Sequence, residues 1–226
     1  MAALVAALPR AAHAGPGGAV HEGQFDFVLR GLRAGVLSFR GVENASSYAV
    51  AARVESTGLI NIVRRVRYDA QSEGSLRGNR LAPRRYREDA DTGRRQSVAV
   101  IEYRRGVPHV IPQPDNPDHR PQLLDPASQA GTVDPLTALY ATLRDQPAER
   151  LCAGVIAIFD GKRRTEVALA QPEPQPDAAV ACAGEYRRLA GFSPEEMSER
   201  TRFPFRILYR PAGTGLMQVV EISVDS

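Results

Sequence analysis

The chain has 226 residues, of which 43% are hydrophobic and 24% charged, and its formal net charge is +3. This composition is ordinary for a soluble globular protein, and the length is sufficient to bury a real core in one large β domain or two small ones. Nearly all of the positive charge is arginine, Lys162 being the single lysine. Because the arginines are interleaved with Asp and Glu and the net charge is small, we expect no nucleic-acid partner.

The N-terminus has features of a secretory signal. Residues 1–8 are apolar, and Ala12-His13-Ala14 matches the small-x-small cleavage pattern. The positive n-region is missing, which points to a start codon placed too far downstream; a disordered or weakly helical Ala-rich leader is the alternative. No later segment has 18 consecutive apolar residues, so no membrane-spanning helix is expected. We therefore predict a truncated signal peptide over 1–14, a flexible leader over 15–23 and a single β-rich domain over 24–226, soluble in the periplasm.

Short segments with alternating or β-branched residues recur along the chain, with turn signals every ten or so residues. This spacing is typical of an antiparallel meander, and a parallel sheet would need crossover helices that the sequence does not provide. The segment 59–68 also fits a helix, although its β-branched content favours a strand. Strands are expected at 25–30, 36–40, 48–54, 59–68, 83–88, 96–104, 203–209 and 216–224.

One amphipathic helix is expected at 134–145, after a proline-rich irregular connection at 108–126. Thr132 or Asp134 caps it, and a proline follows in the first turn. A single helix in a β-rich chain must lay its apolar stripe against a sheet face. The residues of that stripe, at helical spacing, are Leu136, Leu139, Tyr140 and Leu143. A second, short helix is expected after the capping residue Ser193.

The only two cysteines lie in the stretch 152–192, which predicts three strands joined by an Asp-Gly turn and a proline-rich turn. In an oxidising compartment Cys152 and Cys182 are expected to form one disulfide. If both cysteines sit in the outer two of three strands that pair in order, they are about 10 Å apart, whereas a disulfide needs Cα atoms within about 7 Å. The bridge then requires a strongly curled sheet or direct pairing of the outer strands, and two separately buried thiols are the alternative.

No motif for catalysis or metal binding stands out. His21, His109 and His119 have no nucleophile motif beside them and no zinc-ligand spacing. His109 lies in a strand-like run and is interpreted as a packed or surface residue. We therefore expect a protein that is not an enzyme and that uses neither a metal nor a cofactor.

One basic turn is a candidate anion-binding site. Asp160-Gly161 is followed by Lys162, Arg163 and Arg164, three cations that could hold an anionic head group or a phosphate. The alternative is a hairpin tip in which Asp and Gly set the turn and the cations stay in water.

Several phrases of the sequence, in this order, resemble domain of unknown function 3108, a family of exported proteobacterial envelope proteins. They are Phe27-x-Leu29-x-Gly31-x-x-x-Gly35, Glu55-Ser56-Thr57-Gly58-Leu59, Asp134 to Tyr140, Phe159 to Arg164, Cys182-x-Gly184-x-Tyr186 and Gly191-Phe192-Ser193. The resemblance implies export and carries over no catalytic residue. More distantly, such proteins look like the curled open sheets of periplasmic lipoprotein carriers of the Lol pathway, in which a half-barrel with a helical plug holds acyl chains.

Together these observations predict a mainly β fold, an antiparallel strongly curled sheet or open barrel with the 134–145 helix on its concave side. The predicted function is a non-enzymatic envelope protein that binds an apolar or lipid ligand there. The alternative is a structural or assembly factor that binds a protein or anionic glycan through its Arg-rich outer surface. A packed core would use the same residues as an apolar site, namely Leu136, Leu139, Tyr140, Leu143, Ile156 and Ile158.

Overall fold

The structure, a computed structural model, describes residues 2–6, 18–29, 32–57, 66–93, 96–113, 124–152, 154–213 and 215–224. The strands are β1 (Ala2–Ala6), β2 (Ala19–Leu29), β3 (Leu32–Glu43), β4 (Ser47–Ser56), β5 (Arg67–Arg77), β6 (Arg80–Asp91), β7 (Gln96–Arg104), β8 (Val107–Val110), β9 (Val155–Phe159), β10 (Arg164–Pro174), β11 (Val180–Ala190), β12 (Arg202–Pro211) and β13 (Met217–Val224). The helices are α2 (Pro135–Leu143) and α3 (Pro194–Glu199), with the 3-10 turns η1 (Pro126–Gln129), η2 (Ala148–Arg150) and η3 (Pro176–Ala178).

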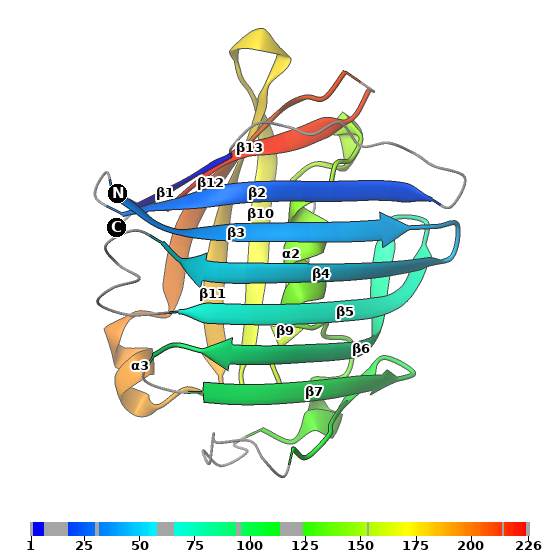
Figure 1. The fold of residues 1–226 in the computed structure, drawn as a ribbon, viewed down its shortest axis with the longest axis vertical. Coiled ribbons are helices and arrows are strands. Elements are labelled where there is room, and N and C mark those ends of the chain that lie inside the picture. Colours follow the sequence, from blue (N-terminus) through cyan, green and yellow to red (C-terminus); the bar gives the residue numbers. More distant parts are fainter. Residues whose placement is uncertain are drawn as a thin grey trace.

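The strands form one antiparallel hydrogen-bonded order, β8-β7-β6-β5-β4-β3-β2-β1-β13-β12-β11-β10-β9, which begins at β8 and ends at β9. In space the order makes two facing layers, a front layer of β2–β8 and a back layer of β9–β13, in which β10 and β11 run across the strands in front (Figure 1). β1 pairs with β2 on one side and with β13 on the other, so it joins the two layers. Helix α2 lies between them (Figure 1).

These features confirm the predicted mainly β, antiparallel fold and the presence of both predicted α-helices. The helix expected over 134–145 is α2, and Asp134 is its N-cap. The short helix after Ser193 is α3, which begins with a complete capping box between Ser193 and Glu196.

β5 was missed by the sequence prediction apart from its first two residues. β5 carries no β-branched residue and turns small side chains to the core, among them Ala70 and Ser72. Apart from Tyr68, β5 lacks the Val, Ile and aromatic residues from which strands are recognised. Its core-facing side leaves room for α2 instead. Of the expected strand over 59–68, residues 58–65 lie outside the described residues.

The proline-rich connection is partly regular. Residues 107–110 form the edge strand β8, and His109 is exposed on it. The connection over 108–126 was expected to be irregular from its start, and this is wrong for its first three residues, because they pair with β7. Residues 114–123, including His119, lie outside the described residues.

The segment predicted as a signal peptide overlaps β1. Residues 2–6 pair with both neighbouring strands. The expected cleavage site after Ala14 lies outside the described residues, so removal of the leader stays a prediction. Within the described part of the chain, no helix is long and apolar enough to cross a bilayer.

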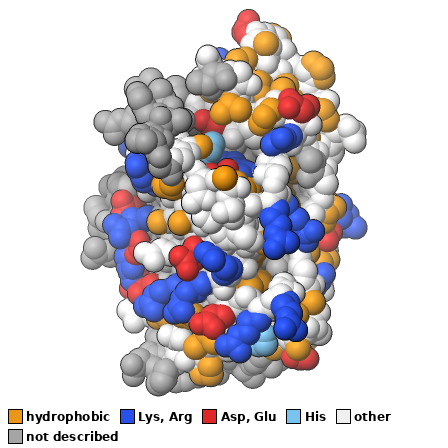
Figure 2. Space-filling model, turned by 90° about the vertical axis from the view of Figure 1, so that its right-hand side faces the viewer, with side chains coloured by type: hydrophobic (Ala, Val, Ile, Leu, Met, Phe, Trp, Pro, Cys, Tyr) orange, Lys and Arg blue, Asp and Glu red, His pale blue; other side chains and the backbone are white. Residues whose placement is uncertain are grey.

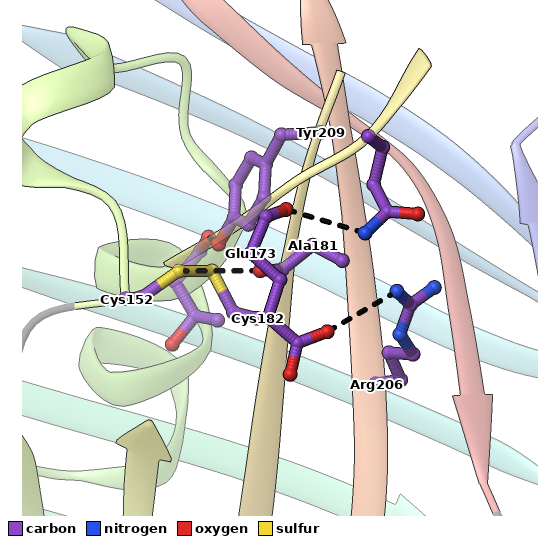
Figure 3. The surroundings of a disulfide bond; sticks show 8 residues. Cys152, Glu173, Ala181, Cys182, Arg206 and Tyr209 are labelled. Carbon is purple, nitrogen blue, oxygen red and sulfur yellow. Dashed lines mark hydrogen bonds and ion pairs between the residues drawn. A yellow bond between two sulfur atoms is a disulfide. The ribbon is translucent and has the colours of Figure 1, made fainter. Parts of the chain in front are cut away.

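The disulfide between Cys152 and Cys182 is present, with Cα atoms 5.4 Å apart (Figure 3). The expectation that both cysteines lie in outer strands is wrong. Cys182 is in β11, but Cys152 lies in a turn before β9, with a left-handed φ of 58°. The pairing of β9 with β10 ends near Gly154, whose carbonyl accepts from Leu169. The chain upstream can therefore leave the plane of the sheet and reach β11, which removes the geometric objection.

Candidate functional site

The N-terminal end of α2 is attached to the front layer by a buried polar network. Asp134 Oδ1 accepts from the backbone N–H of Thr137 at 2.8 Å, and its Oδ2 accepts from the hydroxyls of Thr137 at 2.7 Å and Ser72 at 2.9 Å. The Tyr48 hydroxyl lies 2.7 Å from Thr137 Oγ1. Burial raises the pKa of Asp134 to about 6, although these hydrogen bonds oppose the rise. The network fixes the start of α2 over β4 and β5.

The C-terminal end of α2 is attached to the same layer by Arg144. Its side chain is 4% exposed, and its guanidinium donates to Glu43 and to the carbonyl and side-chain oxygens of Asn79. One turn earlier, the ring of Tyr140 packs directly on Gly41 of β3, where any Cβ would overlap it. With both ends held, α2 is a fixed element of the front layer.

His21 lies beside this end of the helix. Its ring is 6% exposed and meets the Tyr140 ring edge-on at 6.1 Å. Burial lowers the pKa of His21, whereas the carboxylates of Glu43 and Asp145 act in the opposite direction. Within the described residues, its Nδ1 has no hydrogen-bond partner.

The other side of α2 borders an apolar cavity of about 380 Å³. The back layer forms the opposite wall, and the polar lining residues are Thr142, Asp160, Thr165 and Tyr186. The apolar lining comes from α2, β9, β10, β12 and β13 and comprises Pro135, Ala138, Leu139, Leu143, Ile158, Val167, Phe203, Phe205, Ile207, Ile222 and Val224. The volume falls within the range of known ligand pockets, and the lining is mostly apolar.

The structure divides the residues predicted to line an apolar site. Leu139, Leu143 and Ile158 line the cavity. Leu136 and Tyr140 belong to the buried core cluster and are absent from its lining. Ile156 lines a different cavity, on the far side of α2. The sequence analysis treated the apolar residues of α2 as one face packed on one surface, whereas in the structure they contact different surroundings on the two sides of the helix.

A neighbouring cavity of about 490 Å³ shares Pro135, Asp160 and Tyr186 with the apolar one. Lys162 and Arg163 of the predicted anion site line it. Their backbone N–H groups donate to Asp160 Oδ1 at 2.8 and 2.7 Å, which builds the turn.

The guanidinium groups of this turn have protein partners. Arg163 donates to Glu196 at 3.0 Å and stacks over Phe192. Arg164 donates to Gln129 at 3.1 Å. Anion binding by this turn stays a prediction.

The sequence matches the model of one protein family. A family model described as protein of unknown function (DUF3108) matches residues 24–171. The chain belongs to this family. Comparisons with curated proteins and with solved structures find no match.

The DUF3108 match runs from β2 into β10, so it covers α2, the polar network and β9. The remaining back-layer strands, β11–β13, lie beyond it. The apolar cavity therefore combines a DUF3108 wall, which includes Ala138 and Ile158, with a wall from the rest of the chain, which includes Phe205 and Ile222. Within the described residues, no group of three or more His, Cys, Asp or Glu is arranged to hold a metal ion.

The sequence analysis missed the far wall of the apolar cavity and the contacts of Arg144 that hold the end of α2. Phe203, Phe205 and Ile207 alternate in the sequence, a signal that they share one face of a strand. Arg144 follows the last helical residue, where a cation suits the helix dipole, but nothing local indicates that it is buried.

Proposed function

We propose that the protein is a non-enzymatic periplasmic envelope protein that binds the apolar chain of a lipid, or of a lipid-bearing partner, between α2 and the back layer. The observation that carries the proposal is the apolar cavity of about 380 Å³. On this proposal the two layers act as an open barrel or strongly curled sheet with α2 on its concave side. This is the arrangement implied by the resemblance to carriers of the Lol pathway.

The alternative, a factor that binds a protein or glycan through outer arginines, has less support. Many of those arginines have carboxylate partners on neighbouring strands, as in the pairs of Arg53 with Asp69 at 2.6 Å and of Arg187 with Glu166 at 2.8 Å. Paired charges of alternating sign attract an anionic partner weakly.

The test measures binding of a dansyl-labelled undecanoate probe to variants in which a substituted Phe side chain fills one cavity and leaves the other open. Ala138 lines the apolar cavity, whereas Ala141, one turn on along α2, lines the cavity on the far side. We expect saturable binding by the parent and by Ala141→Phe, and loss of binding in Ala138→Phe. Circular dichroism and thermal unfolding check the fold, and Val167→Phe fills the same cavity from β10.

Retention of probe binding by both folded Ala138→Phe and Val167→Phe would contradict the proposal. Native mass spectrometry of protein recovered from the periplasm is the second measurement. A processed protein that carries a lipid mass supports a carrier, whereas an unprocessed cytoplasmic protein contradicts the proposed compartment.

A further inference from the structure

We infer that a second cavity, on the opposite side of α2 from the apolar one, is an oxyanion-binding site that takes a phosphate group. The cavity has a volume of about 330 Å³ and lies between α2, the β5–β6 turn and β9. Three arginines line it, Arg80, Arg144 and Arg150, and among the described residues its lining contains no Asp or Glu. The inference is independent of lipid binding, because it concerns other residues and another ligand.

Arg144 is the buried side chain of this site. Glu43 and Asn79 engage its two terminal nitrogens, which fixes the orientation of the guanidinium. The third nitrogen, Nε, is buried and its N–H has no acceptor within the described residues. A buried N–H without an acceptor is unfavourable, and an oxygen of a bound anion would satisfy it.

Arg80 and Arg150 form the rim. Arg80 begins β6 and Arg150 ends η2, and both are exposed. Neither forms an ion pair with another described residue. The β5–β6 turn lies on the right-hand side of Figure 1, and Figure 2 shows that basic side chains gather over this face.

The charge balance favours phosphate. Glu43 neutralises Arg144, so Arg80 and Arg150 leave two positive charges uncompensated around the cavity. A phosphate monoester carries about −1.5 to −2 at neutral pH and offers three acceptor oxygens, which suits several guanidinium donors. Asn79, Thr137, Thr142 and Gln146 add neutral hydrogen-bonding groups to the lining, and the rest of the wall is mainly apolar, with Leu81, Val133, Val155, Ile156 and Leu169 among its residues.

Such a group has two sources, free phosphate and the phosphate of a lipid head group. Isothermal titration of the full chain with inorganic phosphate and with decyl phosphate distinguishes them. We expect saturable binding of at least one, weakened by about tenfold or more in Arg80→Ala/Arg150→Ala, because two charge-assisted contacts are removed. Arg87→Ala/Arg210→Ala removes the same charge from exposed positions outside the cavity and is the matched control.

Binding of decyl phosphate alone would assign the site to a lipid head group, and binding of both ligands with equal affinity would assign it to free phosphate. The inference is wrong if neither ligand shows saturable binding to the folded parent. It is also wrong if the control pair weakens binding as much as the rim pair, since the effect is then one of net charge. Neither result depends on the dansyl-probe experiment.

Discussion

Asp134 provides a quantitative test of how α2 is held. Its carboxyl group is completely buried, and its pKa is about 6 in the fold against an ordinary value of 3.8. The folded state therefore binds a proton more strongly than the unfolded chain. The stability linked to this proton is fully present below about pH 3.8 and is lost as the pH rises through about 6. The difference between the two pKa values corresponds to about 3 kcal/mol.

The perturbation is Asp134→Asn, which keeps the shape of the cap and an oxygen for the Thr137 N–H, but cannot ionise. The hydroxyls of Ser72 and Thr137 can rotate to accept from the new amide. Urea unfolding of parent and variant at about pH 3.5 and about pH 7 measures the difference in unfolding free energy. We expect the parent to lose about 3 kcal/mol of unfolding free energy relative to Asp134→Asn as the pH rises from about 3.5 to about 7.

Two features make the experiment decisive. His21 and Asp145 have shifted pKa values too, but both are present in parent and variant, so their contributions cancel in the difference. Asp125→Asn is the matched control, because Asp125 caps η1 in the same way while exposed to solvent. If the parent–variant difference for Asp134→Asn is independent of pH, the carboxyl group does not titrate as argued.

Three further predictions concern packing and cross-linking. Replacing Cys152 and Cys182 by serine should lower the unfolding free energy by about 3–4 kcal/mol, measured by urea unfolding, because the bridge closes a separation of 30 residues; an unchanged midpoint would contradict this. Gly41→Ala should lower the unfolding free energy by about 1–3 kcal/mol, because its Cβ overlaps the Tyr140 ring. In thermal unfolding, the double variant with Tyr140→Leu should lose less stability than the sum of the two single variants, because the smaller side chain relieves the overlap. Tyr209→Phe should lower the unfolding free energy by about 1 kcal/mol, because the Tyr209 hydroxyl donates at 3.0 Å to a backbone carbonyl of α2. A variant as stable as the parent would show that water replaces this hydrogen bond.

The sequence was sufficient to predict the fold class because the signals involved are local. Turn residues, the alternation of apolar and polar residues in strands, and the caps of α2 and α3 can each be recognised within a stretch of about ten residues. Where prediction failed, the cause was a long-range arrangement. The two-layer packing that covers both sides of α2 has no local signal, so Leu136 and Leu139 were assigned to one surface although they face different environments.

The last strand shows a local cause of failure. Strict alternation in β13 places Met217 and Val219 on the face opposite to Ile222 and Val224. In the structure the register shifts so that Val220 has no partner in β12, which is a β-bulge. Beyond the bulge each side chain of β13 points to the opposite face from the one that strict alternation predicts. Met217 and Val219 are therefore buried on the same inner side on which Ile222 and Val224 line the apolar cavity. Nothing in the composition of this strand indicates an extra residue.

Thr142 lines both the apolar cavity and the arginine-lined cavity. One residue of α2 is thus a boundary of two sites, and a ligand that displaces it in one cavity alters the wall of the other. Thermodynamic linkage makes any such effect reciprocal, because the factor by which the first ligand changes the affinity of the second equals the factor by which the second changes that of the first. If both proposed ligands bind, α2 would couple the two cavities as well as form part of the wall of each.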